Sequence, residues 1–297
     1  MHKQKVHLVL GSGGARGIAH IGVIEELEKN GFSIQSVSGS SMGALVGGIY
    51  CAGQLETYKN WLVNLDKIDV LRLVDFTLSS YGFVKGDRVF SAIEKLIGDH
   101  YIEDFRIPFT AVATDITLKK EVHYTSGSLF NALRASVAIP SVLTPVHSGK
   151  SSLVDGGVLN PLPLSVIKKQ ADEWVVAVNV NANIPPRMRS SKESKQEKEE
   201  KNEYLSKMYD LVSQVWNSKS KKESEEKMGL FELMNRSVDL LQDKLTELTL
   251  ASYQPEIVVN ISRDECSTFE FYRAKELIKI GKEALQHALE EMEAPKS

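Results

Sequence analysis

The sequence contains few cysteines, no long apolar run and no excess of positive charge, and each of these absences excludes a class of protein. Two cysteines among 297 residues, Cys51 and Cys266, cannot build the disulfide framework of a small secreted domain. No uninterrupted apolar stretch reaches the roughly 18 residues that would predict a membrane-spanning helix. The formal net charge is −3 and no Cys/His spacing resembles a zinc module, so nucleic acid is not expected as a partner.

The chain also lacks the marks of a secretory signal. A few polar residues lead directly into the apolar segment VHLVL, with no long apolar region and no small-residue cleavage site. We therefore expect a cytoplasmic protein, and peripheral contact with the inner face of a membrane stays open. With 42% hydrophobic and 25% charged residues, the chain has the composition of a globular protein that buries a substantial core.

Short β-rich segments alternate with helical patterns over the first 180 residues. This alternation predicts an α/β fold of three layers, with a mainly parallel sheet between helices. A last strand at 255–261 and a closing helix at 269–292 resume the pattern near the C-terminus. The other predicted strands span residues 5–10, 33–38, 109–114, 153–154 and 173–181, and the other predicted helices span residues 17–30, 42–52 and 87–97.

Changes in composition divide the chain into three segments. Residues 5–181 form the predicted catalytic core, residues 185–250 a charged helical insertion, and residues 255–294 the last strand and closing helix of the same domain as the core. The insertion carries two amphipathic apolar stripes, within 205–216 and 230–248. The sequence leaves open whether these stripes complete the core, pair with each other, cover a site or contact a lipid surface.

A serine between two glycines is the first candidate for chemistry. The segment VSGSSMGALVGG places Gly39, Ser41 and Gly43 in a G-x-S-x-G pattern, after a predicted strand and before a predicted helix. In that context the pattern predicts a nucleophile elbow, a sharp turn that exposes the serine hydroxyl at a helix N-terminus. The alternative is that Ser40 or Ser41 caps the helix, but a cap does not explain why both flanking positions are glycine.

A nucleophilic serine needs a base, and no histidine in the sequence is an obvious candidate for it. The usual hydrolase order places histidine late in the chain, where only His287 qualifies, and that residue belongs to the amphipathic closing helix. Among the earlier histidines, His147 is the best competitor and His20 belongs to the helix after the first glycines. No partners are apparent for the other histidines, which are His2, His7, His100 and His123.

An aspartate offers a different base. The segment SSLVDGGVLNPLP ends a short predicted strand in Asp155, Gly156 and Gly157. A carboxylate there can lie against a serine without an imidazole between them, because the two glycines allow another segment to approach. On spacing alone, however, Asp-Gly is a hairpin signal, and a plain turn is the favoured interpretation.

The segment LVLGSGGARGIAHIGV runs from a strand through glycines into a helix, which points backbone N–H groups at an anion. The anion is either the pyrophosphate of a dinucleotide or a charge that develops during a reaction. A nicotinamide-dependent oxidoreductase needs glycines at positions one, three and six and an acidic residue after the second strand. Counting from Gly11, the sixth position is Arg16, and Gly39 follows the second strand, so this alternative fits poorly.

Four segments together, GSGGARGIAHIGV, GSSMG, RASVAIP and DGGVLNPLP, resemble the patatin-like phospholipase family in its bacterial form. The resemblance covers roughly residues 5–180 in the right order. It implies a patatin-like α/β/α sandwich and a serine-dependent hydrolase of lipid esters, acting on phospholipids or lysophospholipids without cofactor or metal. It also implies a catalytic dyad, with Ser41 as nucleophile and Asp155 as base. A catalytically silent member of the family is the remaining alternative.

The resemblance further implies that the glycine-rich loop provides the oxyanion hole. The backbone N–H groups of Gly13 and Gly14 would receive the oxyanion, and Ala15, Arg16 and Gly17 complete the loop. The chain departs from the family at Ser12, where a glycine is common, so the first contact of the loop stays open. The RASVAIP segment (134–140) is expected to shape the wall of the site without a catalytic task.

Overall fold

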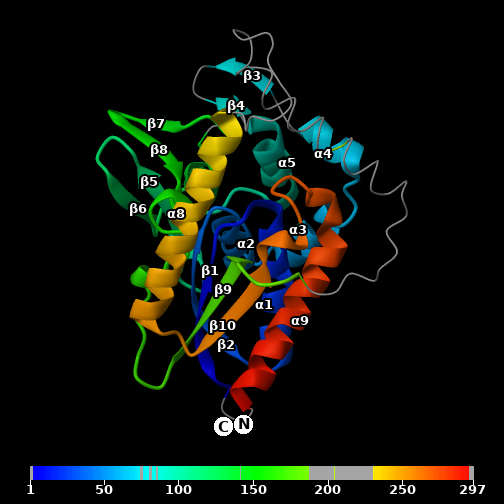
Figure 1. Cartoon of the computed structure of the whole chain (residues 1–297), viewed down its shortest axis with the longest axis vertical. Helices are drawn as coiled ribbons and strands as arrows, with labels where there is room; N and C mark the ends of the chain where they lie inside the picture. Colours follow the sequence, from blue (N-terminus) through cyan, green and yellow to red (C-terminus); the bar gives the residue numbers. More distant parts are fainter. Residues whose placement is uncertain are drawn as a thin grey trace.

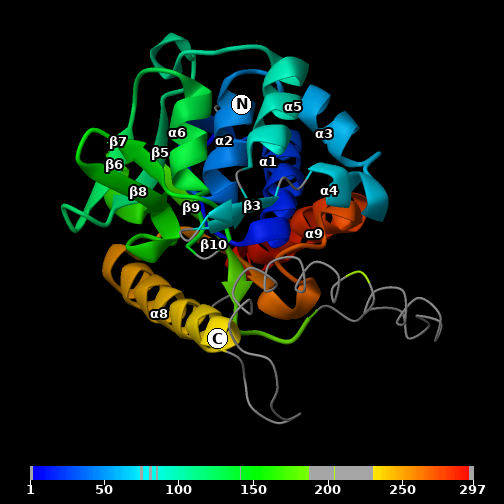
Figure 2. The ribbon, with the colours of Figure 1, turned by 90° about the horizontal axis from the view of Figure 1, so that it is seen from above.

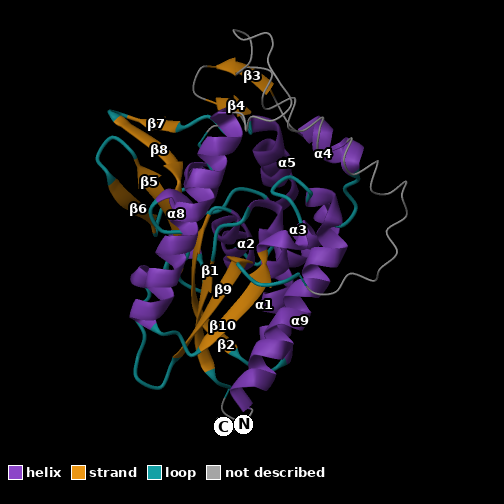
Figure 3. Ribbon diagram, viewed as in Figure 1, coloured by secondary structure: helices purple, strands orange, loops and turns teal. Residues whose placement is uncertain are grey.

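A computed structural model of the chain contains one large, mainly parallel sheet flanked by helices (Figures 1 and 3). The structure describes residues 3–73, 76–79, 82–84, 86–140, 142–186, 204 and 230–293. Its strands are β1 (Lys5–Leu10), β2 (Ser33–Ser40), β3 (Phe76–Ser79), β4 (Gly82–Val84), β5 (Phe109–Asp115), β6 (Lys120–Tyr124), β7 (Val146–Ser148), β8 (Ser151–Asp155), β9 (Trp174–Ala182) and β10 (Ile257–Ser262). Its α-helices are α1 (Ala19–Lys29), α2 (Met42–Cys51), α3 (Leu55–Leu62), α4 (Lys67–Leu73), α5 (Asp87–Ile97), α6 (Leu129–Ser136), α8 (Leu230–Tyr253) and α9 (Ala274–Glu293).

The strand order of the large sheet is β10-β9-β1-β2-β5-β8-β7, with β6 also paired to β5. The pairs from β10 to β5 are parallel, whereas β6 and β8 each pair antiparallel with β5, and β7 pairs antiparallel with β8. The predicted α/β class with a mainly parallel sheet is therefore confirmed. The antiparallel strands β6 and β7 were not predicted, because they are short and partly polar.

The two faces of the sheet are covered by different layers (Figure 2). Leu8 and Leu10 of β1 pack into the main hydrophobic core, together with apolar residues of α1, α2 and α9. Val9, between them, points to the opposite face and packs in a second cluster with Leu162 and Leu164, against which Leu250 of α8 packs. This alternation along one strand follows from the two-residue period of a strand and produces the three layers.

Helix α8 begins at Leu230, within the predicted insertion. Four of its leucines are exposed, with 68% of Leu240, 64% of Leu241, 54% of Leu248 and 47% of Leu233 accessible to solvent. The earlier apolar stripe of the insertion, 205–216, lies outside the described residues. Among the helices that the structure describes, none is long and apolar enough to cross a membrane.

Candidate active site

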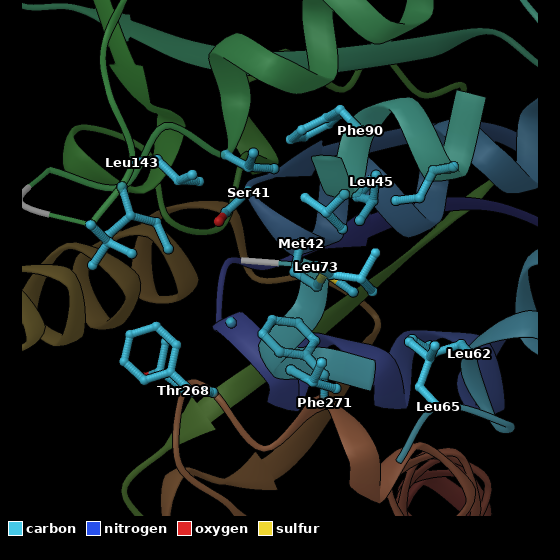
Figure 4. Close-up of a pocket in the computed structure, with 18 of the residues that line it drawn as sticks. Ser41, Met42, Leu45, Leu62, Leu65, Leu73, Phe90, Leu143, Thr268 and Phe271 are labelled. Atoms are coloured by element: carbon cyan, nitrogen blue, oxygen red, sulfur yellow. The ribbon is translucent and has the colours of Figure 1, made fainter. Parts of the chain in front are cut away.

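The candidate nucleophile lies in a strained turn between β2 and α2. Ser41 has φ 56° and ψ −126°, a conformation that L-residues other than glycine rarely adopt. Such a conformation costs about 1–3 kcal/mol and persists only where the surrounding structure enforces it. The turn carries Ser41 into the mouth of a pocket, where its hydroxyl faces the space between the lining side chains (Figure 4).

The glycines on either side of Ser41 are required by close contacts. A Cβ on Gly43 would lie 2.1 Å from the carbonyl oxygen of Leu10, and one on Gly39 would lie 2.4 Å from the carbonyl carbon of Gly43. Neither serine caps α2, because Ser41 makes no side-chain capping bond and the Ser40 hydroxyl donates to the carbonyl of Asn160 at 2.6 Å. The capping alternative therefore does not explain this turn.

Asp155 ends β8 and is almost fully buried, with 3% of its surface exposed. Its Oδ1 accepts a hydrogen bond from the Gly157 N–H at 2.7 Å, and its buried Oδ2 has no partner of ordinary hydrogen-bond geometry among the described residues. Burial raises the pKa of Asp155 to about 6, and interactions with the nearby Ser41 hydroxyl and the Gly157 N–H oppose that rise. The chain continues from Asp155 into a short 3-10 turn (Gly156–Val158), not into a hairpin.

The glycine-rich loop lies beside the serine. Loop residue Gly17 contacts Met42, the residue after Ser41, so closely that a Cβ on Gly17 would lie 2.5 Å from Cγ of Met42. The N–H groups of Ala15 and Arg16 are used within the fold, since they donate to the carbonyls of Thr268 and Gly13.

Within the described residues, the backbone N–H groups of Gly13 and Gly14 donate no hydrogen bond to a backbone carbonyl. Arg16 fixes the loop from the side, because its Nε donates to Asn181 Oδ1 and its Nη1 to the carbonyl of Cys266, both at 3.0 Å.

An apolar pocket of about 180 Å³ opens at Ser41 (Figure 4). Apart from the loop residue Gly14, Ser41 and Thr268, its lining comes from apolar or aromatic side chains of α2, α3, α4, α5 and two loops. Leu45, Leu62, Leu73, Phe90, Leu143 and Phe271 represent these six sources in the figure. A cavity of this kind accepts a hydrocarbon chain and offers nothing to a charged group.

Comparison with known proteins places this site in a family. Residues 8–167, more than half of the chain, match the profile described as patatin-like phospholipase. The chain belongs to the patatin-like phospholipase family. As a member of this family, it is a lipid ester hydrolase.

Relatives of this patatin-like chain include proteins matched over nearly their full length. An uncharacterized NTE family protein of Mycobacterium bovis and one of Mycobacterium tuberculosis are each 34% identical, over 97% of this chain and 92% of theirs. A lysophospholipase of Yarrowia lipolytica is 34% identical over 60% of this chain but only 13% of its own length. The solved structure of VipD from Legionella pneumophila covers 98% of this chain and 67% of its own, at 13% identity and a TM-score of 0.46.

The histidines of this patatin-like phospholipase occupy other places. His147 is exposed and bonds to Ser152, and the side chain of His287 is 61% exposed on α9 and pairs with Glu291. His20 is fully buried in α1, and burial lowers its pKa to about 4, so a neutral ring donates from Nε2 to the carbonyl of Gly11. His20 thus supports the glycine loop from behind.

A serine–histidine–acid arrangement lies in another part of the sheet. His7 Nδ1 is 2.6 Å from Ser36 Oγ, and His7 Nε2 is 2.8 Å from Glu173 Oε2. These partners were not apparent from the sequence, because they are 29 and 166 residues away from His7. None of the three residues lines the pocket at Ser41, since His7 and Ser36 lie within β1 and β2 and Glu173 immediately precedes β9.

Ser136 was not predicted as a functional residue, yet it touches the nucleophile turn. Its fully buried hydroxyl accepts the backbone N–H of Ser41 at 3.0 Å and donates to the carbonyl of Val112 at 2.6 Å. The residue belongs to the RASVAIP segment, and that motif was the only signal for it in the sequence. We interpret Ser136 as a positioning residue that holds the strained turn.

We expect Ser136→Ala to lower kcat about 10-fold with little change in KM, because the turn loses its buried acceptor while the pocket stays intact. The rate at which a fluorophosphonate labels Ser41 should fall in parallel. Ser128→Ala is the matched control, since it removes the capping serine of the same helix, whose hydroxyl accepts from Asn131. Equal losses of activity in the two variants would contradict the positioning role.

Proposed function

We propose that the chain hydrolyses carboxylic esters of phospholipids or lysophospholipids through an acyl-enzyme on Ser41, with Asp155 as the base. One observation carries the proposal: the strained Ser41, at the mouth of an apolar pocket, interacts with the buried carboxylate of Asp155. The raised pKa of Asp155 suits it to accept and return a proton near neutral pH.

In the first half of the reaction, Asp155 accepts the proton of Ser41 as Ser41 Oγ bonds to the ester carbonyl carbon. The resulting oxyanion is received by the N–H groups of Gly13 and Gly14. The ester C–O bond then breaks, and Asp155 returns the proton to the departing alkoxide. Each donor of such an oxyanion hole contributes about 10²- to 10³-fold in rate.

In the second half, Asp155 takes a proton from water as the water oxygen attacks the acyl carbon. A second oxyanion forms at the same N–H groups. The bond to Ser41 Oγ then breaks, the serine regains its proton, and the fatty acid leaves. Apolar contacts along the pocket hold the acyl chain in place, so that its carbonyl carbon stays at Ser41 in both halves of the reaction.

Fluorophosphonate labelling combined with a panel of lipid esters tests this proposal. We expect stoichiometric labelling at Ser41, together with release of fatty acid from phospholipid or lysophospholipid. A folded protein that neither labels at Ser41 nor releases fatty acid would instead be a silent member of the family.

We also propose that α8 contacts the lipid surface that supplies the substrate. Leu240 and Leu241 are adjacent and largely exposed, and burying them in an interface would recover apolar surface. Leu240→Glu combined with Leu241→Glu should therefore weaken partition onto phosphatidylcholine vesicles by about 10-fold or more.

A control variant tests whether a double substitution on this helix is enough by itself to weaken binding. Lys244→Glu and Glu247→Lys together exchange an exposed ion pair on the same helix without changing apolar area or net charge. This control should bind vesicles as the wild type does. Unchanged partition of the Leu240/Leu241 double variant in a sedimentation assay would refute the membrane contact.

A further inference from the structure

Two residues outside the dyad meet beside Asp155. A Cβ placed on Gly157 would lie 2.8 Å from Nε2 of Gln242, 2.8 Å from Oγ of Ser12 and 3.0 Å from Oδ1 of Asp155. Gln242 belongs to α8, and Ser12 belongs to the glycine-rich loop. One amide, one hydroxyl and the carboxylate of Asp155 therefore crowd around Gly157 and leave no room for a side chain there.

The side chains of Gln242 and Ser12 make few hydrogen bonds to the part of the chain that the structure describes. Among the described residues, the Gln242 side-chain amide has no hydrogen-bond partner, and the Ser12 hydroxyl makes only a long bond of 3.4 Å to the Pro161 carbonyl. The helix that carries Gln242 is nevertheless anchored. The next residue, Asp243, pairs with Arg263 at 2.6 Å, and Leu250 packs on the second apolar cluster.

This polar corner and the apolar pocket serve different parts of an ester. No residue of α8 lines the pocket, and neither does Ser12 or Gly157. In the view of Figure 4, Ser41 lies between the gold ribbon of α8 and the side chains of Leu62 and Leu65. An ester whose carbonyl carbon is at Ser41 and whose acyl chain fills the pocket therefore directs its alcohol half away from the pocket, toward the side on which α8 lies.

We propose that Gln242 and Ser12 form the subsite for the alcohol half of the substrate, and that this alcohol carries a free hydroxyl next to the ester oxygen. An amide and a hydroxyl each donate and accept, which matches a neutral hydroxyl such as that of a glycerol unit and gives no preference for an ionic group. The inference rests on the proposed hydrolase function and adds the chemical class of the leaving group to it.

Two esters that differ by one hydroxyl test the subsite. The 2-hydroxyethyl and propyl esters of the same fatty acid have alcohol halves of nearly equal size. Wild type should hydrolyse the hydroxyethyl ester with a kcat/KM about 10-fold higher. Gln242→Leu should remove this preference by slowing only the hydroxyethyl ester. Lys244→Leu places the same side chain at an exposed position of α8 and should retain the preference.

The outcomes separate this inference from the hydrolase proposal. The subsite is refuted if wild type hydrolyses both esters equally, or if Gln242→Leu slows both esters alike or neither. Failure of wild type to hydrolyse either ester, with no labelling at Ser41, would refute the hydrolase function instead. Thermal unfolding of each variant identifies a loss that comes from misfolding, in which case Gln242→Met repeats the test with an unbranched side chain.

Discussion

Ester hydrolysis by the Ser41→Ala variant is expected to fall by about 10⁴-fold or more, to the limit of detection. The substitution removes the atom that forms the acyl-enzyme, and no described side chain in the pocket lining can replace it as a nucleophile activated by Asp155. It should leave the fold intact, although alanine at φ 56° keeps the strain of the turn. The measurement is fatty-acid release by wild type and variant side by side, with circular dichroism to show folding.

Three controls decide whether another group supports the reaction. His147→Ala and His287→Ala should each retain most of the activity, because these side chains are exposed and bond to Ser152 and Glu291. Ser36→Ala tests the arrangement of Ser36, His7 and Glu173 and should also retain activity. Loss of turnover in a histidine variant would indicate that this histidine acts as the base. Loss of turnover in Ser36→Ala would indicate that the reaction takes place at Ser36 and not at Ser41.

The parts of the fold and the site that could be predicted are those determined by residues close together in the sequence. Strand β1 was predicted at its observed bounds (Lys5–Leu10) because consecutive apolar residues are followed by glycine, and α5 (Asp87–Ile97) because its apolar residues recur at helical spacing. The turn at Ser41 was predicted from the two glycines that flank it. In each case the residues that determine the conformation are adjacent in the chain.

The parts that were missed depend on contacts between distant segments. Nothing near Ser136 indicates that its hydroxyl binds the N–H of a residue 95 positions earlier. The same holds for Gln242, which reaches Gly157 only because α8 packs across the sheet. The closing helix was predicted from residue 269 but begins at Ala274, because Phe269 and Phe271 leave the helical path to line the pocket.

Asp155→Asn is expected to lower the rate of ester hydrolysis by about 10³-fold, because the amide cannot accept the serine proton. For wild type, kcat/KM should rise with pH about a midpoint near 6, the pKa of the Asp155 carboxyl. The variant keeps an oxygen that can accept the Gly157 N–H, so the local geometry has no reason to collapse. A variant that retains wild-type activity, or a wild-type profile that falls with pH through this range, would contradict the role of Asp155 as base.

The same substitution should stabilise the protein at alkaline pH. The carboxyl has a pKa of about 6 in the folded protein and about 3.9 when unfolded, so the folded state binds the proton more tightly. The contribution of Asp155 to the free energy of unfolding is therefore fully present below pH 4 and is lost as pH rises through 6. About two pKa units correspond to roughly 3 kcal/mol.

Asparagine does not titrate, so the variant avoids this loss. Denaturant unfolding should show Asp155→Asn more stable than wild type by up to roughly 3 kcal/mol at pH 8, with the difference shrinking toward pH 4. Equal stabilities at both pH values would mean that Asp155 is not a desolvated carboxylate in the folded protein. If Asp155→Asn raises stability while lowering the rate of ester hydrolysis, the buried charge of Asp155 destabilises the fold and is retained for catalysis.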